Sequence, residues 1–217
     1  QVLRPQFTEL PERTVVVIMD NTDVANGLTT VVPEPLIIAL PVLPVEISSV
    51  GDYSDWAYEL MLHEYTHVAN LYPYRSFYRP LRFVFGSIIS PNVLLPLWYA
   101  EGLAVETETR FSDGGRLRSP YVFSTLSALI RSNRLEDEDI GKINSIEDVD
   151  WPAGLRPYVL GGVLWHHLTE KYGTAIIDTL NEKYAARVPF TIEGAIMQAT
   201  GKVYQEHLDD TYKELRA

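Results

Sequence analysis

The amino-acid sequence predicts an α+β fold in which a small N-terminal β-sheet is followed by a helical C-terminal part. Short β-branched, apolar runs bounded by Pro, Asp and Asn lie before Pro41, and this pattern is typical of strands. Beyond the Gly114-Gly115 turn, apolar residues recur at helical spacing, and Gly and Pro separate the periodic segments. These two observations predict strands first and helices afterwards.

The N-terminal segments can be assigned in order. Residues 14–19 form a β-branched apolar run that predicts a buried strand, and residues 36–40, between two prolines, predict a second strand. Residues 26–32 predict a short hairpin or an edge strand between them. Residues 55–70 have the apolar spacing of a helix, with Ser54 as the candidate N-cap.

A Tyr-, Pro- and Arg-rich connection follows over residues 72–96. Apolar periodicity then predicts helices over residues 97–109, 123–131, 158–171, 175–185, 192–199 and 203–215. We therefore expect an N-terminal α+β lobe over residues 1–110 and a helical lobe over residues 111–217, together forming one unit. The chain begins without Met, which indicates a processed part of a longer chain.

Composition excludes several classes of function. The chain has 18 basic and 29 acidic residues, a formal charge of −11, so a nucleic acid would be repelled on average. It contains no cysteine, which excludes disulfides, thiolate metal sites and a cysteine nucleophile. Residues 81–105 are apolar but contain two prolines, Arg82 and Glu101, which is wrong for a transmembrane segment. The acidic run of residues 136–139 predicts a solvated loop.

The motif H-E-x-x-H occurs at residues 63–67. His63 and His67 are separated by one helical turn, so both imidazoles can point at one ion. Glu64 would lie beside that ion, where a carboxylate can act as the general base that takes a proton from water. Two imidazoles and one carboxylate suit zinc, so we expect one Zn²⁺ per chain. The alternative interpretation is a helix with two partly exposed histidines.

Glu101 supplies the candidate third ligand. It is a carboxylate within an apolar helix, where an unpaired charge is costly, so it needs a partner. A metal ion is one such partner, and a salt bridge to Arg79 or Arg82 is the alternative. Close packing of this helix against the H-E-x-x-H helix is expected from three small residues, Ala100, Gly102 and Ala104.

The H-E-x-x-H motif, followed by W-x-x-E-G-x-A at residues 98–104, resembles the gluzincin zinc metallopeptidases. The resemblance is to the bacterial peptidase-MA-like group, which is related to the M1 aminopeptidases. It implies a thermolysin-like catalytic domain, Glu101 as the third zinc ligand, and hydrolysis of peptide bonds. It also implies that Tyr158, in the segment P-Y-x-x-G, hydrogen-bonds the oxyanion, although a core tyrosine at a helix start is the alternative.

Two departures from the pattern matter. Thermolysin-type enzymes carry a supporting Asp four residues after the ligand Glu, and Val105 occupies that position here. The group that orients the zinc-binding histidines therefore stays open. No G-x-M-E-N segment is present to bind a free N-terminus, so endopeptidase activity is favoured over aminopeptidase activity. In gluzincins an edge strand pairs with the substrate backbone, and residues 28–32 or 36–40 are the candidates.

The competing hypothesis is a catalytically silent scaffold that binds zinc, a membrane or another protein. Residues 72–97 suit a lipid or domain interface, although a loop packed on the helical lobe is the alternative. The expected partners are a peptide or protein substrate and, by resemblance, an extra C-terminal domain, in an extracytoplasmic setting. Of the other histidines, His166 and His167 are expected to be structural or at the surface, and His207 to face solvent.

Overall fold

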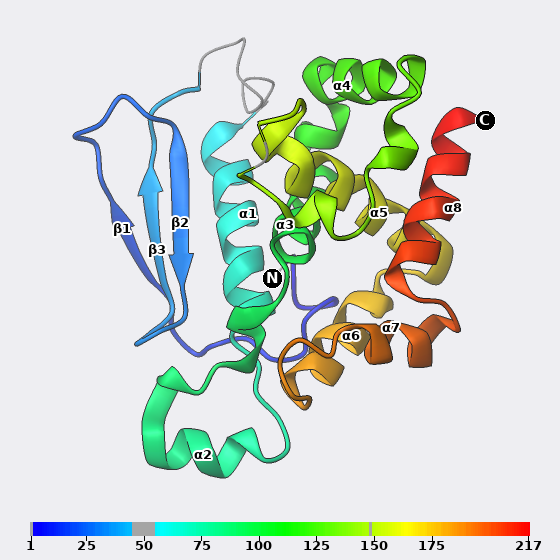
Figure 1. Ribbon diagram of the computed structural model, residues 1–217. Helices are drawn as coiled ribbons and strands as arrows, with labels where there is room; N and C mark the ends of the chain where they lie inside the picture. The colour runs from blue at the N-terminus through cyan, green and yellow to red at the C-terminus, as the bar shows by residue number, and fades with distance from the viewer. Residues whose placement is uncertain (1, 45–54, 148) are drawn as a thin grey trace.

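The computed structural model describes residues 2–44, 55–147 and 149–217 of the chain. Within these residues it contains eight α-helices and one three-stranded sheet, with 58% helix, which confirms the α+β class. The sheet lies on one side of helix α1 (Trp56–Leu71), and most of the other helices lie on the opposite side (Figure 1).

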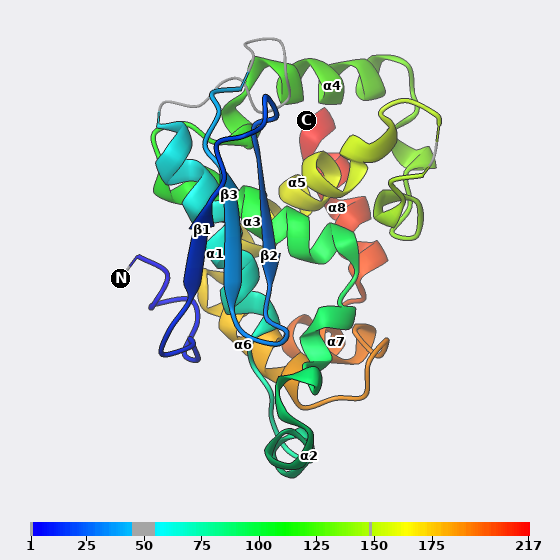
Figure 2. The ribbon, with the colours of Figure 1, turned by 90° about the vertical axis from the view of Figure 1, so that its left-hand side faces the viewer.

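The sheet is small and mixed. Its strands are β1 (Val15–Ile18), β2 (Asn26–Thr30) and β3 (Leu36–Leu40), in the order β1-β3-β2. The central strand β3 pairs parallel with β1 and antiparallel with β2, where Leu28 is opposite Ile38. Ile37 and Ala39 of β3 are buried, and Ala39 packs against the start of α1 in a small second core. Helix α1 therefore covers the β3 and β2 part of the sheet (Figure 2).

The prediction of a buried strand over residues 14–19 is wrong about burial. Strand β1 forms, but Val16, Val17 and Ile18 are exposed. The reason is that β1 lies at the edge of the sheet far from β2, beyond the part of the sheet that α1 covers. Apolar runs of this length are compatible with either environment, and only the packing of the helices decides between them.

The helices follow the predicted order, with one addition. The bounds are α2 Tyr78–Phe85, α3 Leu97–Phe111, α4 Pro120–Arg131, α5 Arg156–Tyr172, α6 Ala175–Ala185, α7 Glu193–Thr200 and α8 Tyr204–Arg216. Helix α2 lies within the segment that was predicted as a connection. Pro80 is tolerated there because it occupies the first turn, where backbone N–H groups have no intrahelical partner.

Helix α1 begins one residue later than its predicted cap implies. The side chain of Asp55 accepts a hydrogen bond from the backbone N–H of Tyr58, at 3.1 Å, and so caps the helix. Ser54, the predicted cap, lies outside the described residues. The last turn of α1 is tied to the helical part of the molecule, because Asn92 donates to the carbonyl of Asn70 and Asn181 donates to that of Ala69.

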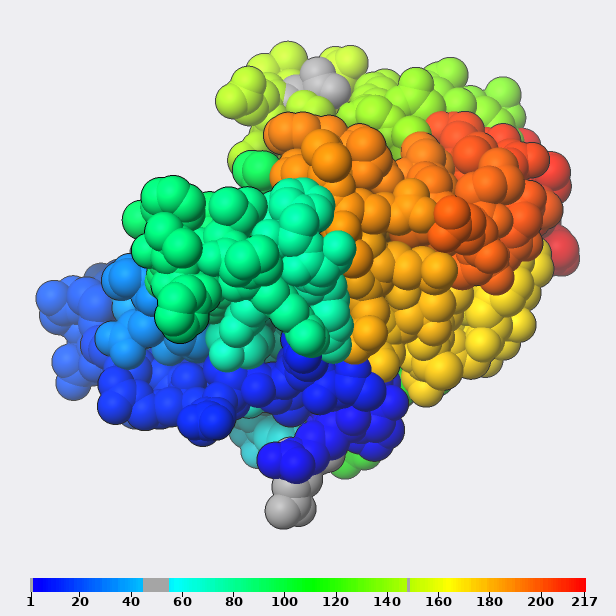
Figure 3. Space-filling model, turned by 90° about the horizontal axis from the view of Figure 1, so that it is seen from below, coloured from blue at the N-terminus to red at the C-terminus, as the bar shows by residue number. Residues whose placement is uncertain are grey.

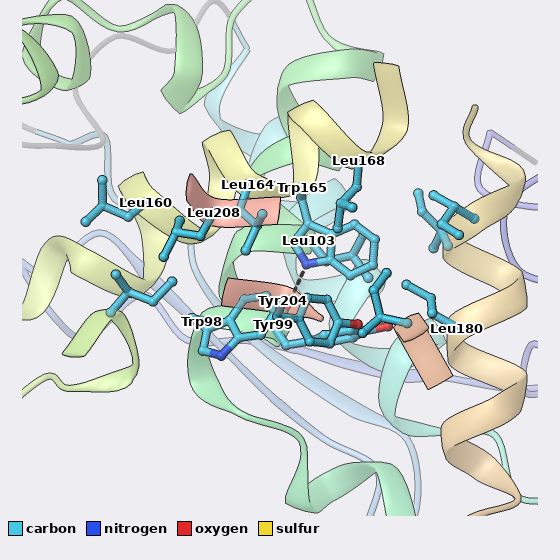
Figure 4. Packing of buried hydrophobic residues seen from close by; sticks show 14 of the residues in the cluster. Trp98, Tyr99, Leu103, Leu160, Leu164, Trp165, Leu168, Leu180, Tyr204 and Leu208 are labelled. Carbon is cyan, nitrogen blue, oxygen red and sulfur yellow. Dashed lines mark hydrogen bonds between the residues drawn. The ribbon is translucent and has the colours of Figure 1, made fainter. Parts of the chain in front are cut away.

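The main core surrounds α3 and α5. Figure 4 shows Trp98, Tyr99 and Leu103 of α3 packed among Leu160, Leu164 and Trp165 of α5, with residues of α6 and α8 around them. The indole N–H of Trp165 donates to the carbonyl of Tyr99 at 2.9 Å, which joins the two helices inside the core. This cluster also includes Leu62 and Ala69 of α1, so one core runs through both predicted lobes.

Helix α3 packs against α1 as predicted, but Gly102 makes its close contact with a different helix, α5. A Cβ atom on Gly102 would lie 2.3 Å from the backbone of Gly161, so the backbones of α3 and α5 touch at this point. Ala100, by contrast, lines the open cleft described below. The expectation that Gly102 would face the H-E-x-x-H helix is therefore wrong. The contact instead sets the spacing between Glu101 on α3 and Tyr158 on α5.

Two further expectations are corrected by burial. His207 is fully buried rather than solvent-facing, because its ring packs against Tyr172 and its Nε2 lies 2.8 Å from the hydroxyl of Thr200. The acidic run of residues 136–139 is not wholly solvated either. Glu138 is fully buried and accepts a 2.6 Å hydrogen bond from the buried Arg156, which holds the first turn of α5 in place.

Seen from below, α2 bulges from the surface beside the N-terminal segment (Figure 3). Among the helices of the described residues, none has the length and apolar character that are needed to cross a bilayer.

We predict that Gly102→Ala lowers the free energy of unfolding by about 2 kcal/mol or more, despite the better helix propensity of alanine, because the added methyl group would collide with the α5 backbone. Urea unfolding measures this change. Gly154→Ala is the matched control: its Cβ would meet its nearest neighbour at an ordinary 3.6 Å, so a change below about 1 kcal/mol is expected. Equal effects in the two variants would contradict the packing argument.

Candidate functional site

The structure brings His63, His67 and Glu101 together. His63 and His67 lie one turn apart on α1, and Glu101 faces them from α3. The Nε2 atoms of the two imidazoles are 3.1 Å apart, and Glu101 Oε2 lies 3.2 Å from that of His63 and 3.4 Å from that of His67. Three ligand atoms of the kinds that zinc binds therefore converge on one point.

The partner of Glu101 is thus the pair of imidazoles, and not Arg79 or Arg82, which were the alternatives. Arg82 instead donates to the carbonyl of Ile89 at 3.1 Å and to the hydroxyl of Ser90 at 2.9 Å. Burial alone would raise the pKa of Glu101, but the charges of the imidazoles and their hydrogen bonds lower it well below its ordinary value. The carboxylate is therefore ionised at neutral pH and available as a ligand.

Glu108 is a functional candidate that the sequence analysis did not find. It lies two turns beyond Glu101 on the same face of α3, and it is fully buried. Its Oε2 is 2.9 Å from His63 Nδ1, so it orients the ring whose Nε2 points at Glu101. A carboxylate in this position fixes the tautomer of a metal-binding histidine. The sequence signal that would have identified Glu108 is its spacing of two helical turns from Glu101. Glu108 takes the supporting role that thermolysin-type enzymes give to an Asp at the position of Val105.

Arg116 neutralises the buried Glu108. Its backbone N–H donates to Glu108 Oε1 at 3.1 Å, and its guanidinium lies 3.2 Å from the same oxygen. Burial raises the pKa of Glu108, while Arg116 and the hydrogen bond with His63 lower it below the ordinary value. Glu108 therefore stays charged although it is buried. The turn of residues 113–115 brings Arg116 back along the end of α3, an arrangement that no local sequence pattern predicts.

Glu64 is held by strand β2. Its Oε2 accepts a 2.7 Å hydrogen bond from the hydroxyl of Thr29, and the same hydroxyl lies 3.0 Å from the backbone carbonyl of Glu64. Gly27 forms the floor under this side chain, because a Cβ atom there would lie only 2.4 Å from Glu64 Oε1. The carboxylate is thus held in one orientation, and neither Gly27 nor Thr29 was identified as its partner from the sequence.

Tyr158 lies on the opposite wall, in the first turn of α5. Its ring is 5.1 Å from the guanidinium carbon of Arg116, and its phenol lies near enough to Glu101 for that carboxylate to affect its pKa. Burial and the nearby Glu101 carboxylate raise the pKa of Tyr158 to about 12, so the phenol keeps its proton at neutral pH. Tyr158 is consequently a hydrogen-bond donor at the edge of the site, and the alternative of a tyrosine confined to the core is not what is found.

These residues share one open cleft of about 650 Å³. Its walls are β2, one face of α1, the start of α3 and the start of α5. Glu64, Glu101, Arg116 and Tyr158 bring charged and polar groups into a lining that is otherwise largely apolar. A cleft with few, convergent polar groups is typical of a binding or catalytic site.

The remaining histidines lie elsewhere. His166 is half-exposed and lies 3.1 Å from Glu106, and His167 Nδ1 lies 2.7 Å from Glu214, so both are structural, as expected. Glu106 also accepts hydrogen bonds from Arg110 and Thr169, on a different face of α3 from Glu101.

Comparisons with models of known families, with curated proteins and with solved structures found no match to this chain.

We predict that, with a chelator present, His63 contributes stability that declines as the pH rises from 6.5 toward 9. Burial and Arg116 lower the pKa of His63, but hydrogen bonds with Glu101 and Glu108 raise it to about 9 in the folded state. A raised folded pKa means that this stability is fully present below the unfolded value of 6.5 and is lost as the pH passes the folded value.

The measurement is the free energy of unfolding of wild type and of Glu108→Gln across this pH range, together with imidazole nitrogen NMR of His63. Glu108→Gln removes the charge of one acceptor of His63, so the free energy of unfolding should fall less between pH 6.5 and 9 than in wild type. A neutral His63 ring at pH 7 in the wild type would contradict the prediction.

Proposed function

We propose that this chain is the catalytic domain of a zinc-dependent peptidase of the gluzincin type, acting as an endopeptidase. The observation that carries this proposal is the convergence of His63 Nε2, His67 Nε2 and Glu101 Oε2 in an open cleft that Glu64 also lines. Two imidazoles and one carboxylate, with an acidic residue adjacent, are the groups that hydrolysis assisted by zinc requires.

The donor set fits zinc in its spacing. Tetrahedral zinc with bonds of ~2.0–2.1 Å needs neighbouring ligand atoms roughly 3.3 Å apart. The three separations here are 3.1, 3.2 and 3.4 Å. Glu108 adds the supporting carboxylate on His63 that zinc sites commonly use. Oxygen-preferring cations such as Mg²⁺ are disfavoured because two of the three donors are imidazoles.

Zinc bound at this position supplies Lewis-acid chemistry, which activates a water molecule and polarises a peptide carbonyl. Glu64 accepts the proton of the water and later transfers it to the leaving amine. Thr29 and Gly27 restrict the orientation of Glu64 for both transfers. Tyr158, which stays protonated, donates a hydrogen bond to the negative oxygen as charge develops on it.

The position of β2 supports an extended peptide as the substrate. Of the two candidate strands, β3 is paired on both sides, so its backbone has no free edge. Strand β2 is an edge strand, and Ala25 to Thr29 line the cleft. A peptide could therefore add to β2 as a further strand and lie along Glu64. The preference for an endopeptidase rests on the sequence, which has no G-x-M-E-N segment to bind a free N-terminus.

We expect purified protein to contain about one zinc per chain and Glu101→Ala to lose most of it, because two imidazoles alone hold zinc weakly. Elemental mass spectrometry after equilibration with zinc measures this. Glu106→Ala is the control, since Glu106 lies on another face of α3 and should leave the zinc content unchanged. Equal zinc retention in wild type and Glu101→Ala would remove Glu101 from the site, and absence of zinc from wild type would favour the silent scaffold.

We expect Glu64→Gln to reduce hydrolysis of an unfolded protein such as casein by about 10²- to 10⁴-fold while zinc content is kept, because the amide cannot accept the proton. Thr29→Val removes the hydroxyl that holds Glu64 and should reduce kcat by about tenfold or more. Thr29→Ser keeps that hydroxyl and should retain most of the activity. Unchanged turnover in Glu64→Gln would contradict the proposed mechanism.

A further inference from the structure

Helix α2 and the turn after it form an apolar projection. Tyr78 is the only residue of α2 whose side chain is buried. Phe83 is 93% exposed, Ile88 76% and Val84 70%. We call the exposed apolar residues of this segment the α2 tip: Leu81, Phe83, Val84, Phe85 and Ile88. So many large, exposed apolar side chains in one short segment mark an interaction surface.

The α2 tip stands away from the body of the molecule. Two views that differ by a quarter turn both place α2 at the lower extremity, below the sheet and below the other helices (Figures 1 and 2). The space-filling view from below shows the same segment as a bulge rather than a hollow (Figure 3). A convex apolar tip suits insertion into a soft medium better than the flat, interlocking contact that two folded proteins make.

The base of this projection is firmly held. The backbone N–H of Arg75 donates to the carbonyl of Ala185 at 2.7 Å, and the hydroxyl of Tyr78 donates to that of Arg187 at 3.0 Å. Arg82 joins α2 to the chain after the turn through the carbonyl of Ile89 and the hydroxyl of Ser90. The fold thus holds the tip out toward solvent, and its exposure does not result from a loosely attached segment.

The charge of this stretch of sequence differs from that of the whole chain, although Glu9 and Glu12 of the N-terminal segment line the same hollow as Arg79 and Arg82. Between Tyr65 and Ala100 the sequence has Arg75, Arg79 and Arg82 but no Asp or Glu, although the chain carries 29 acidic residues. Arg75 is paired with Glu9 and Glu182, whereas Arg79 is exposed. The guanidinium of Arg82 lies 4.2 Å from the ring centre of Tyr74, close to Tyr72. Tyr and Arg behind an apolar tip match the headgroup layer of a bilayer.

We propose that the α2 tip inserts into the surface of a lipid bilayer, with the apolar residues below the headgroups and Arg79, Arg82, Tyr72 and Tyr74 at headgroup level. The proposal is independent of the proposed peptidase activity. It has a geometric consequence, because the short helix Pro91–Leu94 follows the tip and its exposed Val93 lines the cleft. The mouth of the cleft would therefore lie near the bilayer.

The absence of cysteine allows a site-specific test. Phe83→Cys and, as a matched control, Phe123→Cys are each labelled with an environment-sensitive fluorophore and mixed with vesicles of phosphatidylcholine and phosphatidylglycerol. Phe123 is also highly exposed, but it lies on α4 at the opposite end of the molecule. We expect a blue shift and protection from an aqueous quencher for the label at residue 83 alone. No shift at residue 83, or equal shifts at both positions, would overturn the proposal.

Vesicle co-sedimentation of unlabelled protein gives the energetic test. The double variant Phe83→Ser, Phe85→Ser should bind at least about tenfold more weakly than wild type, and Phe123→Ser should bind like wild type. Circular dichroism checks that each variant is folded. Sedimentation velocity without lipid tests the alternative that the α2 tip binds a second copy of the chain. Concentration-dependent dimers that the double variant abolishes, with no vesicle binding by wild type, would overturn the bilayer in favour of self-association.

Discussion

The contact between the carboxylate of Glu101 and the imidazoles of His63 and His67 is the interaction that organises this molecule. Each group would be unfavourable in its partly buried position without the others, because buried charge and unpaired polar atoms are costly. Their mutual contact holds α1 and α3 at one distance and one rotation. The chain of charged contacts continues into the protein from Glu101 through His63 and Glu108 to Arg116. The imidazole of His63 therefore lies between two carboxylates.

The packing of α3 against α5 determines what faces this cluster. The close approach at Gly102 and Gly161 and the Trp165 hydrogen bond leave little freedom for one helix to slide along the other. Tyr158 is carried by the first turn of α5, which the buried pair of Glu138 and Arg156 fixes. The two walls of the cleft formed by α3 and α5 are thus positioned by contacts inside the core. Such rigidity suits catalysis, where donors must be in place before charge develops.

The sheet and the α2 tip contribute in a different way. Strand β2 touches the site directly, through Thr29 and Gly27 on Glu64, and it keeps a free edge toward the cleft. The α2 tip is distant from Glu64, yet it belongs to the chain that connects α1 to α3. The α2 tip is therefore connected along the chain to both helices that carry the candidate ligands, α1 and α3. With the α2 tip in a bilayer, the cleft would be open to peptide substrates close to the bilayer surface.

The sequence by itself determined the α+β class and, except for α2, the order of the elements, because these depend on local periodicity. It indicated His63 and His67 by their helical spacing, and Glu101 by its place in an apolar helix and by the resemblance to gluzincins. His63 and His67 must share a helical face wherever their helix lies. The tertiary structure decided the rest. It selected Glu108 as the support of His63, placed Thr29 on Glu64, and turned Gly102 toward α5 instead of α1. It also exposed β1 and buried His207. These outcomes depend on which surfaces meet, and contacts between segments far apart in the chain follow from packing, which local patterns do not encode.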